Sequence, residues 1–166
     1  SNWTSGSSYL VQSKATDGAS NVETPTVSVS FTFDNISPTS VITVPTNTAK
    51  LKSVSYITGT AGDVVPGVDL SVVRISIKNI GTTKYWQGSV WTAITEANSW
   101  LNVTGLANWS YGSTTFDTGY IYLIKSRATD NANNNETVGA GISFTFDNLG
   151  PSSWIISPTN NAKLNS

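Results

Sequence analysis

Hydrophobic and polar residues alternate along several short stretches of the chain. In the segment SVVRISIKNI, Val73, Ile75 and Ile77 share one side, and the residues between them are polar or charged. GISFTFDN, YIYLIKSRATD and YITGTAGD follow the same two-residue period. Successive side chains of a strand point to opposite faces of a sheet, so this period predicts half-buried strands.

Turn-forming residues separate these stretches, and no stretch has the period of an amphipathic helix. Pro66-Gly67, Gly81-Thr82-Thr83 and Gln87-Gly88 are the clearest turn signals. We expect an all-β fold, an antiparallel immunoglobulin-like β-sandwich of about seven to nine strands. The expected strands cover residues 41–44, 55–61, 70–80, 84–91, 100–104, 108–111, 119–129 and 138–146. Tyr122 falls early in a late strand, where a tyrosine corner would place its hydroxyl against the backbone.

The chain repeats itself after 113 positions. Residues 1–53 align without a gap on residues 114–166, and SFTFDN occurs in both copies. A period of this length fits a whole domain and is too long for one unit of a solenoid. We therefore expect a section of a tandem array. Residues 1–34 form the last strands of a preceding repeat, residues 35–147 form a complete domain, and residues 148–166 begin the following repeat.

Composition narrows the classes of function. Charged residues make up 11% of the chain and the net charge is −1, which argues against a nucleic-acid surface and against polybasic membrane docking. No apolar run is long enough for a membrane span. The chain has no Cys, His or Met, which removes the usual zinc ligands and the cysteine and histidine groups of nucleophilic catalysis. Abundant Ser, Thr and Asn with little Lys and Glu suggest an exported β-protein.

Several segments together resemble the bacterial immunoglobulin-like repeats that occur in tandem in large exported surface proteins and adhesins. These segments are SPTSVITVPTNTAKL, ITGTAGD, GVDLSVVRISIKN, YWQGSVW and SRATDNANNNET before the final SFTFDN. The resemblance implies an extracellular or cell-surface location and a role as spacer, stalk unit or adhesive module. One departure is that Asn133, and Ser20 in the other copy, stand where such repeats usually carry Gly. Asn tolerates a left-handed backbone.

Oxygen-bearing side chains cluster in the segments expected at the entry end of the domain. The loops after residues 61 and 129 lie at the same end of such a sandwich as the entering linker. Oxygen ligands from several loops are what Ca²⁺ requires. No cofactor is required by the chain, but calcium at the domain junction is a hypothesis, with Asp34, Asn35, Asp63, Asp130, Asn131 and Glu136 as candidate ligands. The alternative is that Asp130 and Asp34 only cap a turn and the linker.

The segment KYWQGSVW offers a second candidate site. Tyr85, Trp86 and Trp91 could stack on the face of a sugar ring. The alternative, which we favour, is that the tryptophans fill the core and cover the hairpin. Five Asn-x-Ser/Thr sequons occur, and Asn102 and Asn108 are the better glycan acceptors because they lie away from the junction.

No catalytic residues are assigned. Asp63, Asp69, Glu96 and Asp117 were considered as paired carboxylates for glycoside hydrolysis, and none has a recognisable acid/base setting. The expected function is a mechanical spacer in an extracellular fibre, stalk or adhesin, whose partners are neighbouring repeats of the same chain and fibre subunits. The alternatives are a carbohydrate-binding adhesin module and an accessory domain of a secreted hydrolase.

Overall fold

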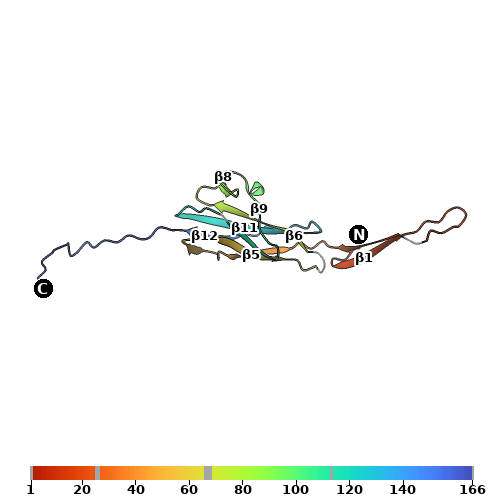
Figure 1. Cartoon of the computed structure of the whole chain (residues 1–166), viewed down its shortest axis with the longest axis horizontal. Helices are drawn as coiled ribbons and strands as arrows, with labels where there is room; N and C mark the ends of the chain where they lie inside the picture. Colours follow the sequence, from red (N-terminus) through yellow and green to blue (C-terminus); the bar gives the residue numbers. More distant parts are fainter. Residues whose placement is uncertain (1, 25–26, 66–68, 113, 166) are drawn as a thin grey trace.

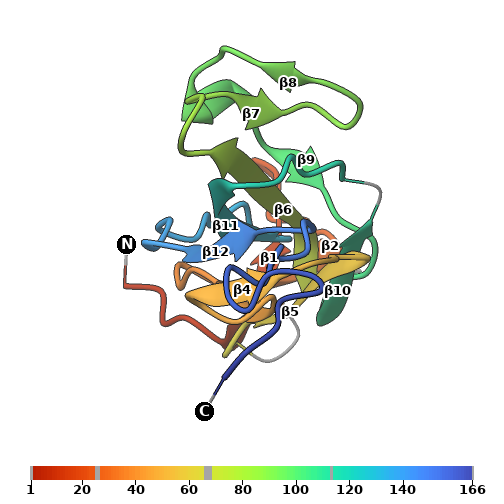
Figure 2. The ribbon, with the colours of Figure 1, turned by 90° about the vertical axis from the view of Figure 1, so that its left-hand side faces the viewer.

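Two mainly antiparallel sheets pack face to face in a computed structural model that describes residues 2–24, 27–65, 69–112 and 114–165. The smaller sheet has the order β10 (Asn108–Gly112), β5 (Tyr56–Gly62), β3 (Thr39–Val44). The larger sheet has the order β4, β12, β11, β6, β7, β8, with β9 also paired to β6. Its strands are β4 (Ala49–Leu51), β6 (Leu70–Asn79), β7 (Tyr85–Trp86), β8 (Trp91–Thr92), β9 (Leu101–Asn102), β11 (Tyr120–Asp130) and β12 (Ile142–Phe146). Figure 2, viewed along the long axis, separates the two layers.

This arrangement is an immunoglobulin-like β-sandwich, as the sequence predicted. The start of the domain contributes a strand to each sheet. β3 pairs antiparallel with β5 in the smaller sheet, and the following β4 pairs parallel with β12 in the larger sheet. Antiparallel β11 lies between β12 and β6 in the larger sheet. A chain that changes sheets in this way closes one edge of the sandwich and leaves the entry linker beside the loops that follow β5 and β11.

The core lies between the two sheets and consists of the residues that the alternation placed inward. Val73, Ile75 and Ile77 of β6 are buried, as are Tyr122, Ile124 and Ala128 of β11. Ile57 and Trp109 contribute from the smaller sheet. Burying side chains of this size is the main favourable term in folding.

The outer face of the larger sheet differs from expectation. Alternation placed Ser76 outward, but it is buried, and its hydroxyl lies 2.6 Å from that of Ser99. Ser99, which directly follows the 3₁₀ turn η1 (Glu96–Asn98), lies against this face. The expected strand at residues 100–104 therefore reduces to a two-residue pairing with β6, and it joins the larger sheet.

An isolated hairpin and an irregular tail extend from opposite ends of the sandwich (Figure 1). The hairpin consists of β1 (Ser7–Ser13) and β2 (Val27–Phe33), which form a separate two-stranded sheet. The tail follows β12 and contains no strand among its described residues, 147–165. Within the described part of the chain, no helix has the length and apolar character needed to cross a membrane.

Tyr122 forms the tyrosine corner that the sequence predicted. Its hydroxyl accepts a hydrogen bond from the backbone N–H of Asp117 at 2.8 Å and donates one to the Asp117 carbonyl at 3.1 Å. Burial of the phenol raises the pKa of Tyr122, because a low-dielectric surrounding disfavours the phenolate. The ring packs against Phe116 and Phe144, at centroid distances of 4.7 and 5.5 Å. The corner thus ties the loop before β11 to the core.

We predict that Tyr122→Phe lowers the free energy of unfolding by about 1 to 3 kcal/mol, because it leaves the backbone groups of Asp117 without their partner. Urea denaturation followed by tryptophan fluorescence measures the change. The matched control is Tyr9→Phe, since Tyr9 accepts the equivalent bond from Thr4 N–H at 2.7 Å in the exposed hairpin. Little change is expected there. Equal losses from both variants would contradict the assignment of Tyr122 as a core-linked corner.

Candidate functional site

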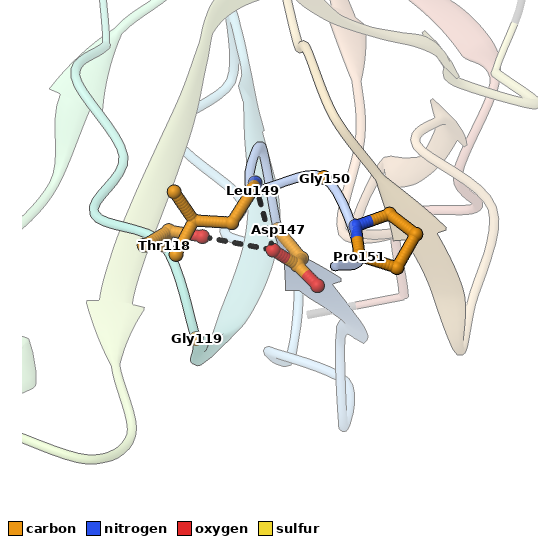
Figure 3. Close-up of a pocket in the computed structure, with 6 residues that line it drawn as sticks. All are labelled: Thr118, Gly119, Asp147, Leu149, Gly150 and Pro151. Carbon is orange, nitrogen blue, oxygen red and sulfur yellow. Dashed lines mark hydrogen bonds between the residues drawn. The ribbon is translucent and has the colours of Figure 1, made fainter. Parts of the chain in front are cut away.

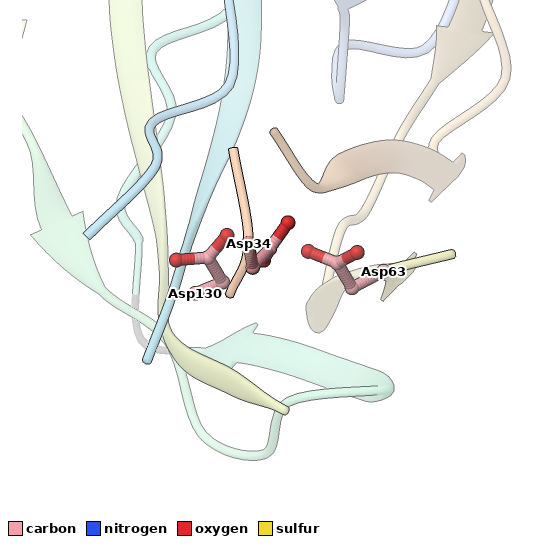
Figure 4. A group of neighbouring side chains, drawn as sticks. All are labelled: Asp34, Asp63 and Asp130. Carbon is pink, nitrogen blue, oxygen red and sulfur yellow. The ribbon is translucent and has the colours of Figure 1, made fainter. Parts of the chain in front are cut away.

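Three aspartates converge where the entry linker meets the complete domain (Figure 4). Asp34 directly follows β2, Asp63 directly follows β5, and Asp130 is the last residue of β11. One carboxylate oxygen from each lies within 4.8 Å of the others. With the repeat boundaries expected from the sequence, Asp34 belongs to the preceding copy, and Asp63 and Asp130 belong to the complete domain.

Asp34 holds the linker in a tight turn with one of its two oxygens. Its Oδ1 accepts hydrogen bonds from the Ser5 hydroxyl and from the Ile36 backbone N–H, both at 2.9 Å. Its Oδ2 is buried and has no hydrogen-bond partner. The residue as a whole is only 9% exposed. A buried polar oxygen without a partner is costly and calls for an explanation.

Asp63, like Asp34, has one carboxylate oxygen that accepts a hydrogen bond and one that does not. Its Oδ1 accepts a hydrogen bond from the Val65 backbone N–H at 2.9 Å, as in a local turn. Its Oδ2, like that of Asp34, is buried without a partner. Two carboxylates from different segments therefore each present an unused oxygen in the same small region.

Asp130 is fully buried and uses both oxygens on one neighbour. Oδ1 accepts the Asn134 backbone N–H at 2.8 Å, and Oδ2 accepts the Asn134 side-chain amide at 2.9 Å. The same amide reaches the Asp34 carbonyl at 3.4 Å. Each carboxylate oxygen has more than one lone pair, so Asp130 retains acceptor capacity toward the cluster.

The negative charge of this cluster has no basic partner among the described residues. The salt bridge that the structure describes joins Lys125 to Glu96 at 2.9 Å and lies elsewhere. Two like charges about 4.8 Å apart repel each other by roughly 3 to 4 kcal/mol at an effective dielectric constant of about 20. Three such carboxylates are therefore suited to a cation, which would remove the repulsion and engage the unpartnered oxygens.

The other three predicted ligands have different surroundings. Glu136 does not belong to the cluster. Its carboxylate accepts hydrogen bonds from Ser40 N–H at 2.8 Å, from the Ser40 hydroxyl at 2.6 Å and from Ala128 N–H at 2.8 Å, so it fastens β3 to β11. Asn35 and Asn131 are exposed at the rim, where their backbone N–H groups bond to the Ser5 hydroxyl and the Asp69 carbonyl.

Sequence reasoning missed Ser5 and Asn134, the two side chains that hold the cluster in position. A signal for them was present in the repeat. The Ser5–Asp34 pair recurs as Thr118–Asp147, and Asn follows Asp by four positions in both copies, at Asn21 and Asn134. A hydroxyl and an amide at fixed offsets from a carboxylate are the natural partners of turn-forming Asp residues.

The aromatic segment is packed rather than open. Tyr85 and Trp86 are 7% and 2% exposed, so neither presents a free ring face. The Trp86 indole N–H donates to the Tyr111 hydroxyl at 3.1 Å, and that of Trp91 donates to the Thr115 carbonyl at 3.0 Å. Trp91 is half-buried, with its ring centroid 5.3 Å from that of Trp86. These contacts agree with the core-packing alternative for the segment.

The predicted glycan acceptors lie on the surface. Asn102 and Asn108 are both exposed, and the Asn102 side-chain carbonyl accepts a bond from the Arg74 guanidinium at 3.0 Å. Their modification stays a prediction.

An open pocket of about 560 Å³ lies at the opposite end of the domain (Figure 3). It is lined by Thr118, Gly119, Asp147, Leu149, Gly150 and Pro151. The Asp147 carboxylate accepts bonds from the Thr118 hydroxyl and the Leu149 N–H, both at 3.0 Å. This pocket belongs to the exit linker.

Comparison with known proteins adds one structural likeness. No family model and no curated protein matches the chain. Among solved structures, the fibronectin(III)-like modules of Clostridium thermocellum CbhA are similar with a TM-score of 0.45 and 14% sequence identity, over 90% of this chain and 68% of that one. The fold assignment rests on the sheet order and register of the chain itself.

Glu136 provides a test that separates structural carboxylates from cluster carboxylates. We predict that Glu136→Gln lowers the free energy of unfolding by about 1 to 3 kcal/mol, because hydrogen bonds to a charged acceptor are lost or weakened. The loss should be the same with calcium and with chelator, as measured by urea denaturation. Glu23→Gln is the matched control, since among the described residues the Glu23 carboxylate accepts one bond, from Ala15 N–H at 3.0 Å, in the exposed hairpin. A loss that calcium abolishes would contradict this assignment.

Proposed function

We propose that the chain is a section of a tandem array of immunoglobulin-like repeats, of the kind found in bacterial exported surface proteins, and that it serves as an extracellular spacer. The observation that carries this proposal is the recurrence of one hydrogen-bonded linker at both boundaries of the complete domain. The exported location is supported by a composition rich in Ser, Thr and Asn and poor in Lys and Glu.

The two linkers use the same atoms. At the entry, Asp34 Oδ1 accepts the Ser5 hydroxyl and Ile36 N–H, while Asn35 N–H donates to Ser5 at 3.1 Å. At the exit, Asp147 Oδ1 accepts Thr118 and Leu149, while Asn148 N–H donates to Thr118 at 3.1 Å. Repetition of such local geometry supports repeats joined by identical junctions.

The amino-terminal hairpin has the internal structure of β11 and β12 but not their surroundings. Tyr9 stacks on Phe31 at 5.6 Å, as Tyr122 stacks on Phe144 at 5.5 Å. Phe31 is 38% exposed, whereas Phe144 is 1% exposed. Val11, the equivalent of Ile124, is likewise exposed. An apolar face of this kind supports the view that the hairpin is the end of a sandwich whose other strands precede it.

The entry linker is short and packed. It spans residues 34–38, between the end of β2 and the start of β3. Pro38 is fully buried, and the Asp34 carbonyl accepts the Asn134 amide. Proline restricts its own φ angle and the conformation of the residue before it. A linker fastened at both ends favours a stiff junction over a flexible one.

The exit linker has the same sequence pattern but no domain packed on it. Asp147 and Pro151 are exposed, whereas their equivalents Asp34 and Pro38 are buried. The open pocket around Asp147 (Figure 3) occupies the place where a following repeat would pack. Under this proposal, a following repeat would bury the exit linker as the sandwich buries the entry linker.

Small-angle X-ray scattering of chains with two, four and six repeats tests the proposal. We predict that the maximum dimension increases in proportion to the number of repeats, as for a rod, because each junction is packed. A matched series in which the residues equivalent to 34–38 are replaced by Gly-Ser should behave as a flexible string, with a smaller increase per repeat. Identical scattering from both series would contradict a stiff spacer.

A further inference from the structure

We infer that Asp34, Asp63 and Asp130 bind one Ca²⁺ ion at the junction between consecutive repeats. The ion's mechanical role deepens the proposed spacer function and rests on it, whereas ion binding itself does not. Asp34 is 9% exposed as a residue, and its Oδ2 atom is buried without a hydrogen-bond partner. This oxygen, together with the unpartnered Oδ2 of Asp63, points to a ligand.

The spacing of the oxygens fits one coordination sphere. Ca²⁺–oxygen distances are about 2.3 to 2.6 Å, so ligands on opposite sides of one ion lie about 4.6 to 5.2 Å apart. One oxygen from each of the three aspartates falls within 4.8 Å of the others. Water or backbone carbonyls would complete the six to eight oxygens that Ca²⁺ accepts.

The chemistry of the donors selects calcium among the common cations. Three carboxylates and no nitrogen or sulfur ligand make a hard-oxygen site. A monovalent ion would leave most of the negative charge uncompensated. Mg²⁺ demands near-ideal octahedral geometry at about 2.0 to 2.1 Å, whereas Ca²⁺ tolerates ligands of irregular arrangement. The ligands Asp34, Asp63 and Asp130 come from three separate segments. Because the two sheets fix the positions of these segments, the ligands are not arranged to form a regular octahedron.

The position of the site gives the ion its effect. Asp34 directly follows the last strand of one repeat, while Asp63 directly follows β5 and Asp130 ends β11 in the next domain. Without a cation, their mutual repulsion opposes packing of the linker. With Ca²⁺ bound, the same three charges attract one centre and hold the two repeats together. Stiffness of the array would then depend on the calcium concentration.

The sequence repeat supplies controls within the same chain. Asp17 is the equivalent of Asp130 and bonds to Asn21 in the same way, through N–H at 2.9 Å and the amide at 2.8 Å. Asp147 is the equivalent of Asp34 and makes the same linker bonds. Neither is part of a described cluster of three acidic residues. Each therefore keeps the local turn chemistry while lacking the other ligands.

The experiment uses the chain as printed, freed of metal with chelator and returned to chelator-free buffer. Isothermal titration with CaCl₂ should give one site per chain, because only the entry junction is complete. Saturating Ca²⁺ should raise Tm by on the order of 5 °C, since a ligand that binds only the folded state stabilises it. The same concentration of Mg²⁺ should give a clearly smaller shift.

Isosteric variants identify the ligands. Asp34→Asn, Asp63→Asn and Asp130→Asn should each lose the calcium-induced rise in Tm, while Asp17→Asn and Asp147→Asn keep it. Asn retains the acceptor oxygen for the turn and removes one repelling charge. For this reason, in the absence of calcium the Asp34→Asn and Asp63→Asn variants should be at least as stable as the unmodified chain. Such stability would show that the variants fold.

The inference is overturned if Ca²⁺ produces neither binding heat nor a Tm shift, if the control variants lose the response as fully as the cluster variants, or if Mg²⁺ gives an equal shift. Scattering of the multi-repeat chains separates this result from the spacer proposal. Calcium binding to chains that scatter as flexible strings would preserve the site and refute the spacer. Chains that scatter as rods but do not bind calcium would support the spacer and refute the calcium site.

Discussion

The pairing of β11 with β6 is the constraint on which the rest of the structure depends. It joins the two longest strands of the chain and aligns Ile124 with Ile77 and Ala128 with Val73 at the centre of the core. The register shifts between Thr129 and Asp130. An irregularity of this kind redirects a side chain at the end of a strand. Asp130 consequently leaves the regular ladder at the level where Asp63 and the entry linker arrive.

The internal repeat places the same turn sequence in two different surroundings, so the effect of local sequence can be told from the effect of packing. The Asp17–Asn21 and Asp130–Asn134 turns share the same two bonds from the Asn backbone N–H and side-chain amide to the Asp carboxylate, and Ser20 and Asn133 both have positive φ. One turn lies on an exposed hairpin and the other against a complete domain. The turn is therefore a local product of Asp, Asn and a residue that tolerates the left-handed conformation. Burial of its carboxylate beside two others is added by the domain.

Much of the fold could be predicted because alternation is a local property. Tyr122, Ile124 and Ala128 are buried as expected, and the tyrosine corner forms at Tyr122. Ser76 was misplaced because alternation cannot indicate that a distant segment covers the outer face of a sheet. The convergence of Asp34, Asp63 and Asp130 followed from the arrangement of loops in such a sandwich. The separate role of Glu136 did not, because its bonds to Ser40 span 96 positions.

The sequence by itself determined the repeat, the strand periods and the turn chemistry, since each depends on residues that are neighbours along the chain or on identity between copies. Tertiary structure alone decided which of the aspartate carboxylates are buried. Asp34 and Asp147 have the same linker bonds, yet one is buried and the other is exposed. The physical reason is that desolvation and repulsion depend on what packs against a group in space, and only the entry linker has a complete domain packed against it.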